Sequence, residues 1–222
     1  MRMTLRSMLS FMAALASLAF IFTSCRRDAA YTRTEGMIWN TSYHITFKGA
    51  PELEDSILAV LDGVGKSLNV FDENSLISKI NRADSMETDA HFRSVYKGSA
   101  RLHDASGGMF DPTLSPLITA WGFGKGHEVT ADTAAVDSIL KFVGFGKTRL
   151  RGDSIIKGDR RIQFNFSAIA KGYGCDCVAA MLERNGVKDY LVEIGGEIAV
   201  GGKGPGKDGW LISVDKPIES EG

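Results

Sequence analysis

Apolar and polar positions alternate in several short stretches of the chain. In the stretch YHITF, the residues Tyr43, Ile45 and Phe47 alternate with polar neighbours. A period of two predicts a strand that turns one face toward a core. The stretch RIQFNF, residues 161–166, has the same pattern. Further short apolar runs, separated by glycine-rich turns and predicted as antiparallel strands, lie at residues 148–157, 190–194, 197–200 and 210–217.

Longer stretches carry apolar residues at helical spacing. Between Pro51 and Asn69 they recur every three or four positions, and proline suits the first turn of a helix. A turn and a short helix are predicted within residues 71–82, and longer helices at residues 92–105, 130–143 and 167–185. Because helices and hairpins are mixed along the chain and do not alternate strictly, we predict an α+β fold with mixed or antiparallel sheets flanked by helices.

The N-terminal segment has a different pattern. Arg2 and Arg6 precede an apolar run, residues 8–22, which is shorter than the roughly 20 residues of a membrane-spanning helix. This arrangement is typical of a secretory signal. The following FTSC ends at Cys25 and resembles a bacterial lipoprotein signal, although a simple cleaved signal or an uncleaved anchor stays open. We expect a signal peptide at residues 1–24, lipidation of Cys25, a polar tether at residues 25–35 and one domain at residues 36–222. The protein would then be anchored on the periplasmic side of the bacterial cell envelope.

Composition excludes some partners. The formal net charge is −1 and charged residues make up 24% of the chain, which gives no electrostatic basis for binding nucleic acid. Cys175 and Cys177 lie two positions apart in a predicted helix, so their side chains point to different faces. We expect two small buried residues there and no disulfide or joint metal site.

The junction after residue 165 combines features of an anion or metal site. Asn165 ends the alternating stretch, and Ser167 is a suitable cap for the helix that follows. Unpaired amides at a helix start favour a negative group, and Lys171 lies one turn further on. The carbonyl of Ala168, if turned outward, is an oxygen donor that suits Mg²⁺. A plain corner between a strand and a helix explains the same residues.

A second stretch, GGMFDPTLSPLITAWGFG at residues 107–124, is rich in glycine and aromatic residues. Paired glycines allow close approach to a flat ligand. Phe110 and Trp121 offer ring faces, and Asp111 precedes a proline. A structural aromatic cluster is equally compatible with this composition.

Together, five stretches of the chain resemble one family. The stretches WNTSYHI, FDENSLISKINR, GGMFDPTLSPLITAWGFG, NFSAIAKGYGCD and YLVEIGGEIAVGGKG have the order and spacing of the FAD:protein FMN transferases, the ApbE family. The resemblance covers about residues 36–217. It implies an enzyme that uses FAD and Mg²⁺, transfers FMN to a threonine or serine hydroxyl of a target protein, and releases AMP. It also implies targets among the flavoprotein subunits of membrane electron-transfer complexes.

The resemblance also implies roles for individual residues. Trp39 stands where the family usually has methionine, Phe71 where it has tyrosine, and Asn165 where it often has aspartate. Ala168 matches a metal ligand that acts through its backbone oxygen, and no general base can be named. The residues matched to FAD contacts are Trp39, Phe71, Met109, Phe110, Asp111, Asn165 and Lys171.

Two expectations concern activity. Family members continue beyond the last residue of this chain, into a His…Asp-Pro-x-Thr-Gly motif and the Asp and Thr side chains that complete the metal site. We therefore expect the chain as printed to be C-terminally truncated and inactive alone, and to become active when that portion is added. The alternatives are hydrolysis of FAD to FMN and AMP, and a non-catalytic lipoprotein that binds flavin.

Overall fold

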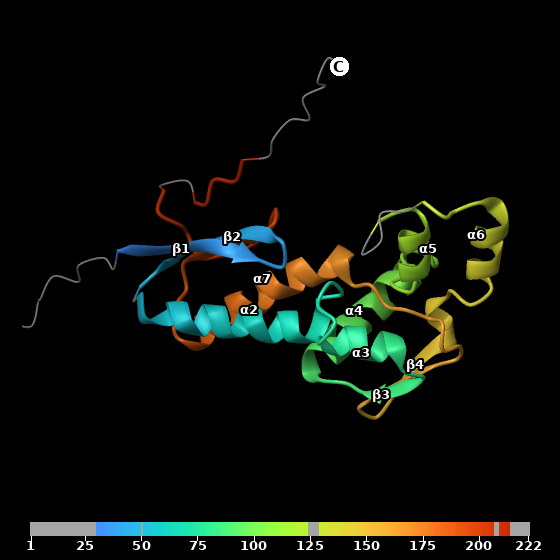
Figure 1. Ribbon diagram of the computed structural model, residues 1–222. Helices are drawn as coiled ribbons and strands as arrows, with labels where there is room; N and C mark the ends of the chain where they lie inside the picture. The colour runs from blue at the N-terminus through green and yellow to red at the C-terminus, as the bar shows by residue number, and fades with distance from the viewer. Residues whose placement is uncertain (1–29, 50, 124–128, 207–208, 214–222) are drawn as a thin grey trace, which may run out of the picture.

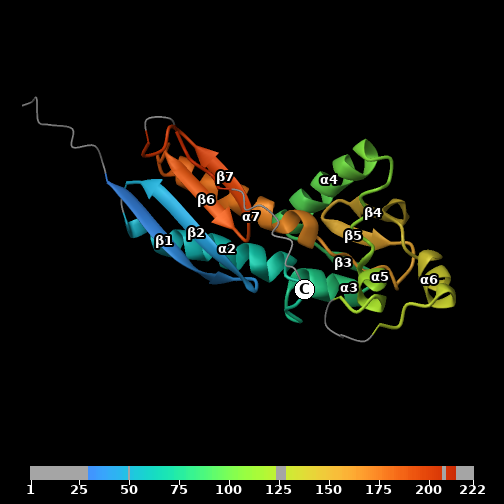
Figure 2. The ribbon, with the colours of Figure 1, turned by 90° about the horizontal axis from the view of Figure 1, so that it is seen from above.

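The computed structural model describes residues 30–49, 51–123, 129–206 and 209–213. Two antiparallel sheets lie at opposite ends of the molecule, and the helices α2 and α7 lie along the larger sheet and extend toward the smaller one (Figures 1 and 2). This arrangement of separate sheets and helices is the predicted α+β fold. Among the described residues, no helix is both long and apolar enough to cross a membrane.

The larger sheet has the strand order β1-β2-β6-β7. Its strands are β1 (Tyr31–Ile38), β2 (Thr41–Lys48), β6 (Tyr190–Ile194) and β7 (Glu197–Gly201). The alternation in β2 is confirmed, because Tyr43, Ile45 and Phe47 are all buried. They pack against α2 (Glu54–Leu68) and α7 (Ser167–Arg184), which cover one face of this sheet (Figure 1).

The predicted tether is wrong over its second half. Strand β1 begins at Tyr31 and pairs with β2 from Tyr31 opposite Lys48 to Ile38 opposite Thr41. Only Thr34 of this strand is buried. An edge strand with one buried side chain carries little hydrophobic signal, so its polar sequence was interpreted as a linker. Residues 1–29, which include the predicted signal peptide and Cys25, lie outside the described ranges.

The smaller sheet has the order β3-β5-β4 and a core of its own. Its strands are β3 (Ser85–Glu87), β4 (Thr148–Arg151) and β5 (Ser154–Lys157). The surrounding helices are α3 (Leu76–Arg82), α4 (Ala90–Ala105), α5 (Ser115–Ala120) and α6 (Thr133–Leu140), with the short 3-10 turn η2 (Phe145–Lys147). A second 3-10 turn, η1 (Pro51–Leu53), leads into α2, and its Leu53 packs on the core of the larger sheet. Aromatic rings dominate this core, namely Phe92, Tyr96, Phe145, Phe164 and Phe166.

The stretch 161–166 is not a strand of either sheet, since it begins in a turn at Arg161 and makes only an isolated bridge at Gln163. Its alternation is real, since Ile162, Phe164 and Phe166 are fully buried. Its backbone is paired differently, because the side-chain amide of Asn81 donates to the carbonyl of Phe164 at 2.9 Å and accepts from the Phe164 amide at 2.7 Å. Its remaining backbone pairing is with residues 112–114, through a parallel bridge of Gln163 with Leu114 and a bond from the Asn165 amide to the Pro112 carbonyl at 2.8 Å.

Two further predictions needed correction. The helix predicted at residues 130–143 is shorter, Thr133–Leu140, and Leu140 is half exposed where we expected a buried face. The strand predicted at residues 210–217 is not formed in its described part, residues 210–213. Apolar residues alone do not hold a segment in a sheet without a partner to pair with its backbone.

Candidate functional site

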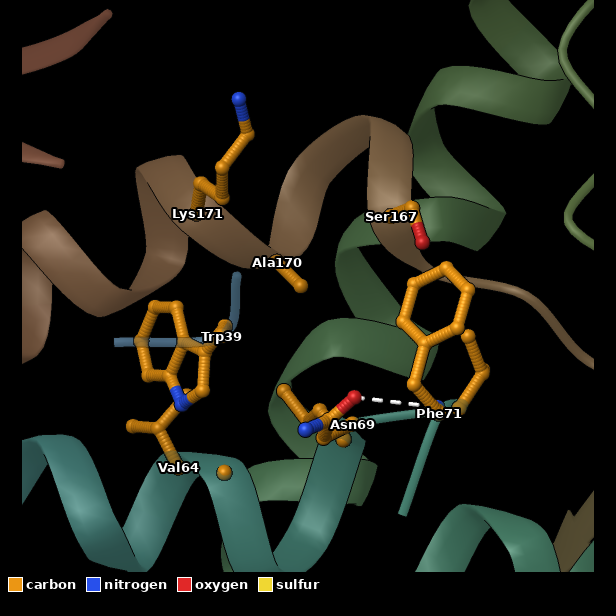
Figure 3. Close-up of a pocket in the computed structure, with 10 residues that line it drawn as sticks. Trp39, Val64, Asn69, Phe71, Ser167, Ala170 and Lys171 are labelled. Carbon is orange, nitrogen blue, oxygen red and sulfur yellow. Dashed lines mark hydrogen bonds between the residues drawn. The ribbon is translucent and has the colours of Figure 1, made fainter. Parts of the chain in front are cut away.

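Two cavities adjoin at the start of α7. The smaller, about 170 Å³, lies between α2, α7 and the turn of Trp39 (Figure 3). The larger, about 820 Å³, lies between α3, the stretch after Gly108 and the stretch before α7. Val70, Phe71 and Ser167 line both cavities, so the two form one continuous site with Phe71 between its halves.

Trp39 forms one wall of the small cavity. It occupies the two-residue turn between β1 and β2 with φ of 50°, and Asn40 follows with φ of 61°. A bulky residue in this left-handed region is unusual, which marks the turn as a place where structure overrides local preference. The indole packs between α2 and α7, and its buried Nε1 has no hydrogen-bond partner among the described residues.

Phe71 stands at the boundary of the two cavities. Its side chain is 50% exposed, and its amide donates to Oδ1 of Asn69 at 3.0 Å (Figure 3). An exposed aromatic ring beside a cavity offers a face for stacking. Phe71, which stands where the family usually has tyrosine, therefore keeps the ring but lacks the hydroxyl.

Met109, Phe110 and Asp111 line the large cavity. Met109 is 87% exposed at its rim, and the preceding Gly107 and Gly108 have φ of 61° and 87°. These left-handed values explain why two glycines stand where α4 ends and the chain turns toward the cavity.

Asp111 has a structural duty that the sequence did not reveal. Its Oδ1 accepts from the amide and hydroxyl of Thr113, at 2.7 and 2.6 Å. Its Oδ2 accepts from the amide of Phe145 at 2.9 Å, and the Thr113 hydroxyl accepts from the amide of Gly144 at 2.9 Å. The carboxylate thus fastens the wall of the cavity to η2.

The start of α7 is capped by a residue other than the one predicted. Asn165 Oδ1 accepts from the Ser167 amide at 2.9 Å, and Ser167 itself is the first helical residue with no cap bond from its side chain. The amides of Ile169 and Ala170 donate to the carbonyl of Phe166. Three of the first amides are therefore already paired, and the expectation of unpaired amides waiting for an anion was wrong for them.

Lys171 lines the small cavity but its ammonium is engaged elsewhere. Nζ donates to the Gly195 carbonyl at 2.9 Å and lies 2.7 Å from Oε2 of Glu197. Figure 3 shows the side chain rising away from Trp39 and Phe71. The side chains of Lys171 and Glu197 are each about one-third exposed, so solvent screens their ion pair. The lysine can therefore exchange the carboxylate for a more highly charged partner such as a phosphate.

Ala168 is exposed and lines the large cavity. It is the second residue of α7, so its carbonyl is directed along the helix axis. The outward-turned carbonyl considered from the sequence is therefore not formed. In the described ranges there is no group of three or more His, Cys, Asp or Glu side chains that could hold a metal. The described residues therefore do not make a magnesium site by themselves.

Sequence reasoning missed part of the site. Asn81, Arg82 and Gln163 contribute polar groups to the large cavity, and Asn69 and Ser167 do so in the small one. Asn81 lies within the stretch FDENSLISKINR that carried the family resemblance, and Asn69 lies two residues before it. Nothing in their spacing indicated that they face a cavity.

Known proteins with this sequence pattern and fold are flavin transferases. An FAD:protein FMN transferase of Vibrio cholerae is 32% identical over 225 residues, covering 95% of this chain and 66% of that protein. One of Haemophilus influenzae is 27% identical, covering 90% of this chain and 63% of that protein. The chain thus spans slightly less than two thirds of the length of these relatives.

Solved structures agree. The flavin transferase ApbE from Vibrio cholerae superposes with a TM-score of 0.78 at 28% identity, covering 85% of this chain and 65% of that one. The apo form of Pseudomonas stutzeri flavinyl transferase ApbE gives 0.77 at 26% identity, covering 84% and 66%. The fold is therefore that of the flavin transferases. Since the family model described as ApbE matches residues 39–221, the chain belongs to the ApbE family.

Proposed function

We propose that the paired cavities bind FAD and that the protein transfers its FMN half to a hydroxyl of a target flavoprotein, as an FAD:protein FMN transferase. The relatives named above carry that activity in their names. We extend it to this chain as a proposal because the chain spans less than two thirds of their length.

One observation carries the proposal. Eight residues that the family resemblance assigns to FAD or metal come from four separate segments of the chain, yet all of them line the two adjoining cavities. A core that merely packs well does not require these particular residues to meet at a hollow. The eight are Trp39, Phe71, Met109, Phe110, Asp111, Asn165, Ala168 and Lys171.

The chemistry is a displacement at phosphorus. The target hydroxyl oxygen, from a threonine or serine, bonds to the flavin-side phosphorus of FAD, and the bond from that phosphorus to the bridging oxygen breaks. AMP leaves with that oxygen, and the hydroxyl proton passes to a base or to water. The contribution of the described residues is to hold and orient the dinucleotide. Phe71 offers a stacking face, and Lys171 offers one positive charge.

Mg²⁺ belongs to the proposal only in part. When bound, it would offset negative charge on the diphosphate. Ala168 is the described residue that the family resemblance assigns to the ion. Its carbonyl is directed along α7, so the oxygen would bind the ion beside its helical hydrogen bond, and the remaining ligands would come from outside the described residues. Removal of divalent cations with a chelator should abolish transfer, and addition of Mg²⁺ should restore it.

The test of function is a transfer assay. The purified protein, extended by the C-terminal portion that the family resemblance implies, is incubated with FAD, Mg²⁺ and a flavoprotein subunit of a membrane electron-transfer complex, and the subunit is weighed by mass spectrometry. Transfer adds FMN to the subunit and releases AMP. Release of FMN and AMP without an adduct would instead show hydrolysis, and tight FAD binding without AMP would show a non-catalytic flavin protein.

We also propose that Cys25 carries a lipid that holds the protein at the periplasmic face of the bacterial cell envelope. The support is the charged, apolar and small-residue order of residues 1–25. Metabolic labelling with a fatty-acid analogue should mark the protein, and Cys25→Ala should abolish both the label and the membrane fraction. An unlabelled protein that stays in the membrane fraction would contradict lipidation.

A further inference from the structure

A lysine is buried behind the large cavity. Lys157, the last residue of β5, is only 7% exposed. Its Nζ lies 3.0–3.1 Å from four backbone carbonyls, and among the described residues it has no ion-pair partner within contact distance. A charge in such a place normally needs a partner, so the carbonyls must supply the compensation. They belong to Ile80, Asn81, Arg160 and Ile162.

The four carbonyls come from two segments that are distant in sequence. Those of Ile80 and Asn81 are at the C-terminal end of α3, where the helix dipole is negative, and the Ile80 carbonyl also accepts from the amide of Ala83 at 3.1 Å. Those of Arg160 and Ile162 flank the start of the extended stretch that leads into α7. The ammonium therefore joins the end of a helix to a segment that belongs to neither sheet and pairs with backbone only at residues 112–114.

This junction lies directly behind a wall of the cavity. Asn81, whose carbonyl faces Lys157, uses its side chain to hold both the amide and the carbonyl of Phe164. The amide of Asn165 donates to the carbonyl of Pro112 at 2.8 Å, which ties the same stretch to the opposite wall. Asn81, Asn165 and Pro112 all line the large cavity.

We propose that these four carbonyls form a cation site whose resident cation is the Lys157 ammonium, and that Lys157 is a positioning residue for the wall of the large cavity. It lines neither of the two cavities described above and acts through Asn81 and the stretch 162–165. That the ligand is FAD rests on the function proposed above, whereas the role of the ammonium in holding the wall does not.

The charges around Lys157 fit this role. Burial lowers the pKa of Lys157, Asp84 and Asp159 oppose that shift, and Arg160 adds to it. An uncharged side chain of the same length would leave the carbonyls of Asn81, Arg160 and Ile162 without the donor that they have in the structure. The four carbonyls thus require a cation, but that cation does not need to be covalently attached to β5.

The experiment separates charge from tether and from bulk. In Lys157→Ala, n-propylammonium is added to the buffer to replace the three methylene groups and the ammonium that the substitution removes. The uncharged control of similar size is n-propanol. Lys157→Met keeps the bulk and removes the charge. Lys147→Met is the matched variant elsewhere, since the exposed Lys147 donates to carbonyls of Lys141 and Val143 near the end of α6.

Amide hydrogen exchange of Phe164 and Asn165, measured without FAD, is the first readout. Both Lys157 variants should speed exchange by about tenfold or more, because about 1.4 kcal/mol of lost local stability corresponds to tenfold. Propylammonium should restore protection to Lys157→Ala, propanol should not, and Lys147→Met should match the unaltered protein. FAD affinity, the second readout, should fall and recover in parallel.

Three results overturn the proposal: unchanged exchange in Lys157→Met, equal rescue by propanol, or failure of propylammonium to restore protection to Lys157→Ala. If Lys157→Ala folds only when propylammonium is present, the proposal holds, and if propylammonium cannot make it fold, the proposal fails. Absence of FAD binding by the unaltered protein would contradict the proposed function alone, because the exchange readout contains no FAD.

Discussion

The indole of Trp39 fills the space that a side chain on Gly174 would need. A Cβ at position 174 would lie 2.6 Å from Cη2 of the indole and 2.9 Å from Cζ3. On the other side, a Cβ at Gly65 would lie 2.6 Å from Nε1. Two helices therefore approach the ring through glycines, which lets the turn between β1 and β2 reach the small cavity.

This contact predicts the result of replacing Gly174 by alanine. Alanine is normally favoured over glycine inside a helix by roughly 0.5–1 kcal/mol. In Gly174→Ala the indole must move, and we expect a net loss of about 1–3 kcal/mol in the free energy of unfolding. Chemical denaturation measures the loss, and the emission of Trp39 should change with it.

The matched control lies two residues earlier in the same helix. A Cβ at Gly172 would meet nothing within 4 Å, so Gly172→Ala should be neutral or stabilising by the helix preference alone. If the two alanine variants had equal stability, the packing of Trp39 against α7 would not be the reason for the glycine.

Asp111 is predicted to matter for stability as well as for binding. Asp111→Ala leaves the amides of Thr113 and Phe145 without their acceptor, and we expect a loss of about 2–3 kcal/mol in the free energy of unfolding. The exposed Asp104, whose side chain has no described hydrogen bond, provides the control Asp104→Ala. An Asp111→Ala variant that keeps its stability but loses FAD affinity would contradict the structural role.

Much of the fold was predictable because its signals are local. The alternation of β2, the apolar spacing of α2 and the glycine pair that ends α4 all gave elements that the structure contains. The stretch 161–166 is not a strand of either sheet because its partners are the side chain of Asn81 and a single backbone bridge to Leu114, both far away in sequence. Pattern rules describe faces and periods, and they do not describe where a backbone finds its hydrogen bonds.

The residues of the candidate site were likewise predictable, whereas their hydrogen-bond and ion-pair partners were not. Its residues were named by resemblance, and the structure brings them to two cavities. The present partners of those residues could not be predicted: Glu197 for Lys171, the amide of Ser167 for Asn165, and the amide of Phe145 for Asp111. Each depends on contacts between segments that only the folded chain brings together.

Substitutions of Lys171 and of its partner Glu197 are expected to change the FAD affinity differently. Lys171→Met removes a charge that would contact phosphate, and we expect affinity to fall about tenfold. Glu197→Gln leaves the lysine in place without its carboxylate competitor, so affinity should stay the same or rise. Fluorescence titration of FAD measures both, and an equal loss in both variants would show that the pair serves only to hold β7 against α7.

The two described cysteines are predicted to resist alkylation. Burial raises the pKa of Cys175 to about 12 and also raises the pKa of Cys177. A thiol whose pKa is raised stays protonated at pH 8, and its reactive thiolate becomes abundant only as the pH approaches that raised pKa. Native protein treated with iodoacetamide at pH 8 should remain unlabelled at Cys175 by mass spectrometry.

Unfolding provides the control for that measurement. In denaturant both thiols, which are free in the structure, should react at the rate of an ordinary cysteine. Rapid labelling of Cys175 in the native protein would mean that α7 and β7 separate readily, because its Sγ donates to the carbonyl of Glu197 at 3.2 Å.

The most direct test of the central claim is a crystal structure of the protein soaked with FAD and Mg²⁺. We predict that the dinucleotide lies across both cavities, with an aromatic part against Phe71 and the diphosphate beside the first turn of α7, where the ammonium of Lys171 has left Glu197 to meet it. FAD bound elsewhere, with both cavities holding only water, would contradict the account.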